Sequence, residues 1–113
     1  MSKTSEAVTQ ELEYVIGTIL SVERRSLKTN LQKVLYSLLR ANSRWVPRNA
    51  FRVPSATSRL RDLRKESYGA FPVECLVRPD KSENWTKSKP SYYRLKEVDV
   101  SELRRLFSHL FQE

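Results

Sequence analysis

The sequence predicts one mostly helical α+β domain, and three observations lead to this prediction. The chain has 113 residues, of which 39% are apolar, so it can form one domain around a modest core. Apolar residues recur at helical spacing along several segments. Two short runs, 71–78 and 91–95, instead carry the aromatic and β-branched residues that are typical of strands.

The first two predicted helices are amphipathic. Over residues 5–20 the apolar positions form a single stripe, although β-branched residues leave a strand open for the second half of this segment. A second stripe begins at Leu27 and is ended by Asn42. Val46 then suits a very short strand. Pro47 fits the first position of a short helix, because the N–H that proline lacks would be unpaired there anyway.

A third predicted helix has clear signals at both ends. Ser55 is a suitable N-cap for a helix over 56–68, and Gly69 follows as the residue that adopts the left-handed conformation after a helix. Leu60 and Leu63 fall on one face, which predicts that this face packs on the core. The opposite face carries hydroxyl and charged side chains, namely Thr57, Ser58, Arg61, Asp62 and Lys65.

The last third of the chain predicts an antiparallel hairpin followed by a helix. The two strand-like runs would pair, with the polar segment 79–90 as the tip between them. Alternation along the first run predicts that Cys75 is buried, and the position of Trp45 before the short strand predicts that it packs in the core. Asp99, followed three residues later by a carboxylate, resembles a capping box and begins a helix over 99–112.

The positive charge is concentrated in the middle of the chain. With 21 Lys and Arg against 13 Asp and Glu, the formal net charge is +8. Residues 27–96 alone carry 16 basic and 5 acidic side chains, a net of +11, whereas 1–26 and 97–113 come to −1 and −2. Seven of the eight basic residues within 40–65 are Arg, whose planar guanidinium matches phosphate groups and guanine edges. The central segment therefore predicts a polyanionic partner.

Residues that usually carry catalysis or cofactors are scarce. One cysteine allows neither a disulfide within the chain nor a thiolate zinc cluster, and two glycines cannot form a glycine-rich phosphate loop. His109, the single histidine, has no Ser or Cys partner in a recognisable arrangement. Pro79, Asp80 and Glu83 match the start of a metal-dependent nuclease signature, but Trp85 stands where that signature has Lys. We therefore expect no enzyme activity, no metal and no cofactor, in a cytoplasmic protein without a membrane span.

The order of elements resembles a winged helix-turn-helix domain of the small prokaryotic and phage type. The resemblance covers about residues 27–96 and rests on the hairpin, on Trp-Val-Pro-Arg-Asn-Ala-Phe at 45–51 and on Ser-Ala-Thr-Ser-Arg-Leu-Arg-Asp-Leu-Arg-Lys at 55–65. It implies that 55–68 is a recognition helix in the major groove of double-stranded DNA and that 79–90 is a wing at the backbone or minor groove. The expected recognition residues are Ser55, Thr57, Ser58, Arg59, Arg61 and Lys65, and the expected backbone and wing residues are Arg44, Arg48, Arg52, Lys81, Trp85, Lys87 and Lys89. Trp85 would stack at the groove or fold back onto the hairpin.

The two terminal helices, within 1–26 and 97–113, add apolar stripes that such a domain does not usually need. Packing against a second copy in a homodimer is expected, and folding back onto their own domain is the alternative. The expected function is that of a sequence-specific double-stranded DNA-binding protein, a transcriptional regulator that is nucleoid-associated when bound. Two alternatives stay open: a protein-interaction or assembly module on the same scaffold, and the DNA-tethering subunit of a larger nucleic-acid enzyme or an RNA binder.

Overall fold

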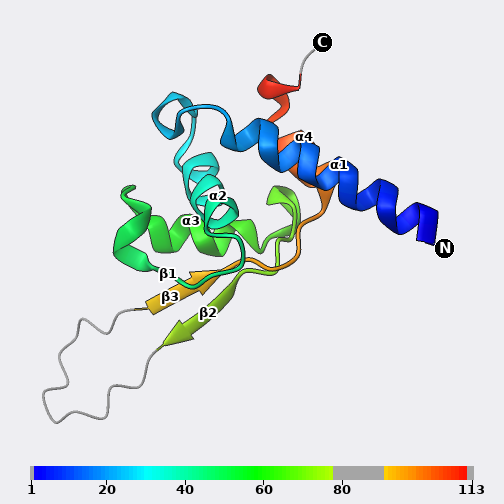
Figure 1. Cartoon of the computed structure of the whole chain (residues 1–113). Helices are drawn as coiled ribbons and strands as arrows, with labels where there is room; N and C mark the ends of the chain where they lie inside the picture. Colours follow the sequence, from blue (N-terminus) through cyan, green and yellow to red (C-terminus); the bar gives the residue numbers. More distant parts are fainter. Residues whose placement is uncertain (1, 78–90, 112–113) are drawn as a thin grey trace, which may run out of the picture.

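A computed structural model describes residues 2–77 and 91–111 of the chain (Figure 1). The fold is of the α+β class and mostly helical, as the sequence predicts. Its elements in chain order are α1 (Ser2–Leu20), the 3-10 turn η1 (Arg24–Ser26), α2 (Asn30–Ala41), β1 (Val46–Pro47), η2 (Arg48–Phe51), α3 (Ala56–Leu63), η3 (Glu66–Tyr68), β2 (Glu74–Val77), β3 (Ser91–Arg94), α4 (Val100–Leu106) and η4 (Ser108–Leu110).

Helix α2 is the central element and begins later than its apolar stripe predicts. Thr29 caps it, because the Thr29 hydroxyl accepts a hydrogen bond from the N–H of Gln32 at 3.1 Å. Leu27 is buried but precedes this cap, so it belongs to the incoming loop and not to the helix. The helix ends at Asn42, as the sequence predicts, and the structure shows that Asn42 adopts the left-handed conformation.

Helix α3 is shorter than the predicted helix over 56–68. It stops at Leu63, and the chain continues through Arg64 and Lys65 into the separate 3-10 turn η3. The Leu63 carbonyl accepts a hydrogen bond from the Phe71 N–H at 2.7 Å, a partner eight residues on that turns the chain back towards the sheet. The sequence predicts that the Ser55 hydroxyl caps this helix, and that prediction is wrong. The backbone of Ser55 is left-handed at φ 56°, and its hydroxyl makes no cap hydrogen bond. Only the Ser55 carbonyl takes part, by accepting from the Arg59 N–H.

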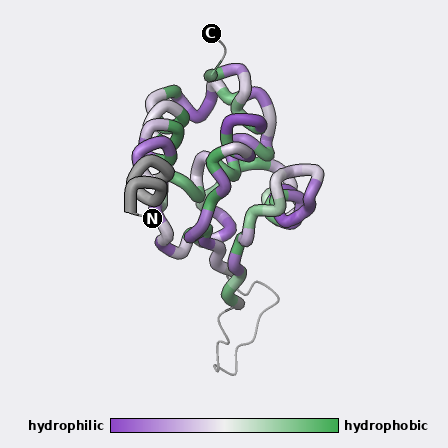
Figure 2. The backbone as a smooth tube through the Cα atoms, turned by 90° about the vertical axis from the view of Figure 1, so that its right-hand side faces the viewer, coloured by the Kyte–Doolittle hydropathy of each residue, from purple (hydrophilic) through white to green (hydrophobic). Residues whose placement is uncertain are grey.

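The sheet has three antiparallel strands in the order β1-β3-β2. The predicted hairpin is confirmed, since β2 pairs with β3, and Val46 lies opposite Tyr93 on the other side of β3. Pro47 lies in β1 and at the N-cap of η2, not at the first helical position that was predicted. Cys75 is exposed, so its predicted burial is wrong: β2 is an edge strand where the hairpin runs away from the helices (Figure 2).

One continuous core joins the three segments 1–26, 27–96 and 97–113. Val15 and Ile19 from α1 are fully buried in the same cluster as Leu103 and Phe107 from the C-terminal end. Figure 1 shows α1 and α4 lying together over one end of α2. The terminal helices therefore fold back on their own domain at these positions. A homodimer was expected because no part of the domain was expected to cover their apolar stripes, and at these four residues that reason is wrong. The homodimer itself stays a prediction.

The C-terminal helix begins at the predicted cap but does not reach residue 112. The Asp99 carboxylate accepts from the N–H groups of Ser101 and Glu102 at 2.9 and 3.4 Å. The Glu102 carboxylate does not complete a capping box, because it pairs with Arg105 at 2.6 Å. Helix α4 then ends at Leu106, and a short 3-10 turn follows.

We predict that Gly69→Ala destabilises the protein by at least about 1 to 2 kcal/mol, the cost of a left-handed backbone for an L side chain. Gly69 has φ 102°, and an added Cβ would lie 2.6 Å from Cε2 of the buried Phe71. Gly17→Ala is the matched control, because Gly17 is inside α1 and a Cβ there would have no atom within 4 Å apart from its chain neighbours and the backbone of the same helix. Urea unfolding should show this control gaining about 0.5 to 1 kcal/mol. Equal effects of the two substitutions would contradict the packing at Gly69.

Candidate nucleic-acid interface

Helix α3 presents a polar face to solvent because its apolar face is fixed. Leu60 and Leu63 are 1% and 0% exposed and pack towards α2, as the helical wheel predicts. The opposite side of the helix carries Thr57 and Arg61, which are both exposed. A side chain that extends from this face can therefore reach a partner without any change in the core.

Asp62 changes the electrostatics of the predicted recognition face. Its carboxylate lies 3.2 Å from the Arg59 guanidinium and 3.1 Å from the Lys65 ammonium group. Both cations are predicted to bind nucleic acid, and in the structure each of them pairs with Asp62. Such partly exposed pairs contribute little to stability, about 0 to 1 kcal/mol, so a nucleic acid could still compete for them. Arg61 is the α3 cation without a carboxylate within 4 Å among the described residues.

The start of α3 adjoins a hollow of about 300 Å³. Its walls come from η2 and from the first turn of α3, and include Arg48, Arg52, Ser55 and Thr57. The structure thus brings together two predicted backbone-binding residues and two predicted recognition residues. Because the Ser55 hydroxyl makes no cap hydrogen bond, the first-turn N–H groups of α3 lack that acceptor and adjoin the same hollow.

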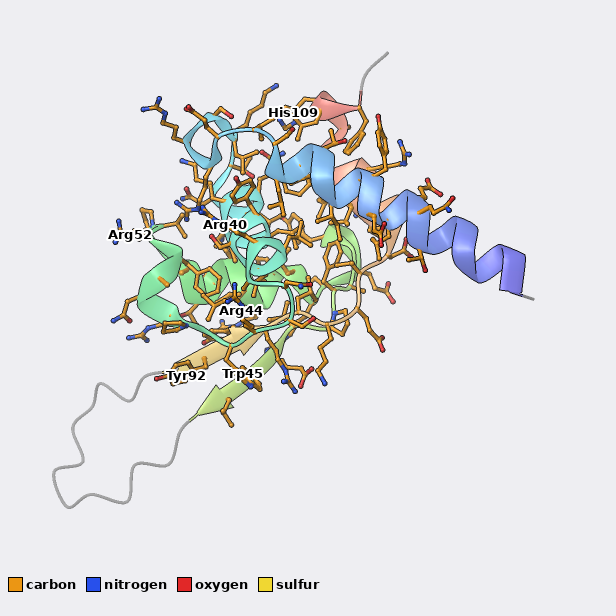
Figure 3. The ribbon with its side chains drawn as sticks, viewed as in Figure 1. Arg40, Arg44, Trp45, Arg52, Tyr92 and His109 are labelled. Atoms are coloured by element: carbon orange, nitrogen blue, oxygen red, sulfur yellow. The ribbon has the colours of Figure 1, made fainter. Side chains whose placement is uncertain are left out.

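Arg44 and Trp45 lie apart from this hollow, in the turn between α2 and β1. The Arg44 Nε donates to the Ala41 carbonyl at 2.9 Å, and the side chain is exposed. Trp45 is half-buried and not in the core, so its predicted packing is wrong: the guanidinium of Arg94 lies 4.2 Å from its ring centroid and covers it. Figure 3 shows Arg44 and Trp45 close to the sheet, away from Arg52. Arg44 is thus outside the group formed by Arg48 and Arg52.

The predicted wing residues Lys81, Trp85, Lys87 and Lys89 lie outside the described residues. The described part of the hairpin ends at Val77 and Ser91, and it points away from α1 and α4 (Figure 1).

Sequence reasoning assigned no site role to two arginines that the structure adds to the basic surface. Arg24 and Arg40 line a pocket of about 410 Å³ together with Arg52, and we call this the arginine pocket. Arg24 had been assigned to the nearly neutral segment 1–26. A signal for it does exist, because residues 24–61 contain ten Lys and Arg and not a single Asp or Glu.

The described residues show neither a metal site nor a membrane span, and comparisons with known proteins found no match. Within the described residues there is no group of three or more His, Cys, Asp or Glu that could hold a metal ion. None of the helices in the same ranges is long and apolar enough to cross a membrane. A scan against protein-family models and searches of curated proteins and of solved structures found no match.

Proposed function

We propose that this protein is a winged helix-turn-helix protein that binds double-stranded DNA in a sequence-specific manner and acts as a transcriptional regulator. The order of elements in the fold supports this proposal. Helix α2, strand β1, turn η2 and helix α3 follow one another, then an antiparallel hairpin closes a sheet of order β1-β3-β2. This is the order of elements that a winged helix-turn-helix domain uses, with η2 as a very short second helix.

The observation that carries the proposal is the cationic surface around the start of α3. Arg48, Arg52 and Arg61 have no carboxylate within 4 Å among the residues that the structure describes. The first two lie beside the N-terminal turn of α3, and Arg61 lies in its second turn, on the exposed face. The positive end of the helix dipole adds to the same field. A phosphate backbone would neutralise charges that no carboxylate in the described part of the chain pairs with.

The proposed roles divide this surface between base and backbone contacts. Thr57, Ser58 and Arg61 read base edges in the major groove, because α3 presents them on its outer side and Arg can form two hydrogen bonds with guanine. Arg48 and Arg52 bind phosphates and set the orientation of the helix. Arg59 and Lys65 have a smaller part, since each shares Asp62.

Substitution of Arg61 tests the base-reading role. Selection from random duplex DNA first supplies the preferred sequence, and a mobility-shift assay then measures affinity. We predict that Arg61→Ala weakens binding to that sequence by about 1 to 3 kcal/mol and relaxes the preference at one position. Arg25→Ala is the matched control, because Arg25 has an 87% exposed side chain paired with Glu23 at 2.6 Å.

Arg48→Ala separates the backbone contact from base reading in the same assay. It should weaken binding to every duplex alike and reduce the slope of log affinity against log salt by about 1. The proposal is wrong if no duplex is enriched, or if both substitutions leave affinity at the level of the Arg25→Ala control.

A further inference from the structure

The arginine pocket is formed by three elements that are far apart in the sequence. Arg24 lies in η1 and Arg40 in the last turn of α2, and Arg52 directly follows η2. Arg40 and Arg52 are labelled in Figure 3. Small apolar side chains, Ala41, Val46 and Ala50, contribute to the remaining wall. Three cations thus converge on a pocket of about 410 Å³, a volume typical of sites for small ligands.

Arg24 is held in position by hydrogen bonds within the protein. Its Nε donates to the Ser37 hydroxyl at 3.1 Å, and its Nη2 donates to the Phe51 carbonyl. The chain that leads into η1 is fixed as well, because the Tyr36 hydroxyl donates to the Val22 carbonyl at 3.0 Å. A guanidinium that is already oriented loses less conformational entropy when a ligand binds.

No carboxylate among the described residues balances the charges in the pocket. Burial and the nearby charge of Arg52 both lower the pKa of Arg24 from its usual range, although an arginine stays protonated at neutral pH. Arg24, Arg40 and Arg52 have no carboxylate within 4 Å in the described part of the chain. An anion in the pocket would offset both the burial of Arg24 and its repulsion by Arg52.

We propose that the arginine pocket binds a phosphate group. Phosphate offers several strong acceptor oxygens, and guanidinium groups can bind them in pairs of hydrogen bonds. The apolar wall next to the three cations would accommodate the carbon atoms of a phosphate ester. The group could belong to a free phosphorylated small molecule or to the backbone of DNA. This site does not depend on the proposed base reading by α3, because neither Arg24 nor Arg40 lines the hollow at the start of α3.

The first experiment uses inorganic phosphate and the full chain without DNA. Phosphate is titrated at constant ionic strength, and binding is followed by NMR chemical shifts. We expect Arg40→Gln and Arg52→Gln each to weaken phosphate binding about tenfold, since each would remove a hydrogen bond between charged groups. Arg25→Gln is the control, because Arg25 is on the same turn as Arg24 but does not line the pocket. The inference is overturned if phosphate does not bind, or if all three variants bind it like the wild type.

A second experiment identifies the source of the phosphate. The affinity of Arg40→Gln for the selected duplex is compared with that of the wild type at one salt concentration. If the pocket takes a backbone phosphate, this substitution weakens duplex binding to a similar degree, and inorganic phosphate competes with the duplex. If the pocket takes a free ligand, duplex affinity is unchanged while phosphate binding is about tenfold weaker. Both results support the site, and neither depends on the outcome for Arg61.

Discussion

Phe51→Ala is expected to destabilise the protein by about 3 to 5 kcal/mol, a large part of the 5 to 15 kcal/mol that is typical of a whole domain. Phe51 is the last residue of η2 and is 0% exposed. Its ring packs edge-on against Tyr93 of β3, with centroids 6.1 Å apart and an angle of 69° between the planes. The Phe51 ring therefore holds η2, the turn that contains Arg48, against the sheet.

The same residue connects stability to the proposed sites. The Phe51 carbonyl holds the guanidinium of Arg24, and Arg52 follows directly in the left-handed conformation. Loss of the ring would release η2 from the core. The distance between Arg24 and Arg52 would then no longer be fixed. We therefore expect the variant, at a temperature where it is still folded, to bind phosphate and duplex DNA more weakly.

Tyr14→Ala is the control for the stability measurement. Tyr14 is also aromatic, but it is 63% exposed on α1, so its removal should change the free energy of unfolding by no more than about 0.5 kcal/mol. Urea unfolding followed by circular dichroism gives both values. Equal losses in Phe51→Ala and Tyr14→Ala would mean that η2 does not dock through this ring.

Local patterns predicted those parts of the fold that local physics determines. The stripe of α2, the core face of α3 at Leu60 and Leu63, and the cap at Asp99 all depend on residues within one or two turns of each other. The antiparallel hairpin follows from two strand-like runs in close succession. The structure confirms these features. At these positions the local pattern is not overridden by contacts with other parts of the described chain.

Contacts outside the local sequence pattern account for two of the predictions that were wrong, the end of α3 and the burial of Cys75. Helix α3 stops at Leu63 because the Leu63 carbonyl accepts from Phe71 and the Arg64 Nε donates to the Val73 carbonyl at 3.0 Å. The helical pattern of 56–68 contains neither partner. Cys75 alternates like a buried residue, but burial depends on where the helices end over the sheet.

The candidate site was predicted only in part for the same reason. Arg48, Arg52, Ser55 and Thr57 lie close together in the sequence, and the structure gathers them at one hollow. Arg24 lies sixteen residues before Arg40, and only the packing of η1 on α2 brings the two into one pocket. The run without acidic residues from 24 to 61 indicates excess charge, but it does not indicate which arginines meet.

Leu103→Ala is expected to destabilise the isolated chain by about 2 to 5 kcal/mol, because Leu103 is 0% exposed and leaves a cavity when it is shortened. It lies in α4 within the same core cluster as Val15 and Ile19 of α1. Ser101→Ala is the control on the same helix, since Ser101 is exposed and contributes only its N–H to the Asp99 cap.

Protein concentration decides what this loss means for the two terminal helices. If α1 and α4 stabilise their own domain, the urea midpoint of the wild type is the same at two concentrations a hundredfold apart, and Leu103→Ala lowers it equally at both. If a second copy supplies part of the cover, mass action raises the midpoint with concentration. The Leu103→Ala loss would then be larger in the concentrated sample, where a dimer exists to be broken. Size measurement on the same samples, with and without duplex DNA, would show whether pairing occurs only on DNA.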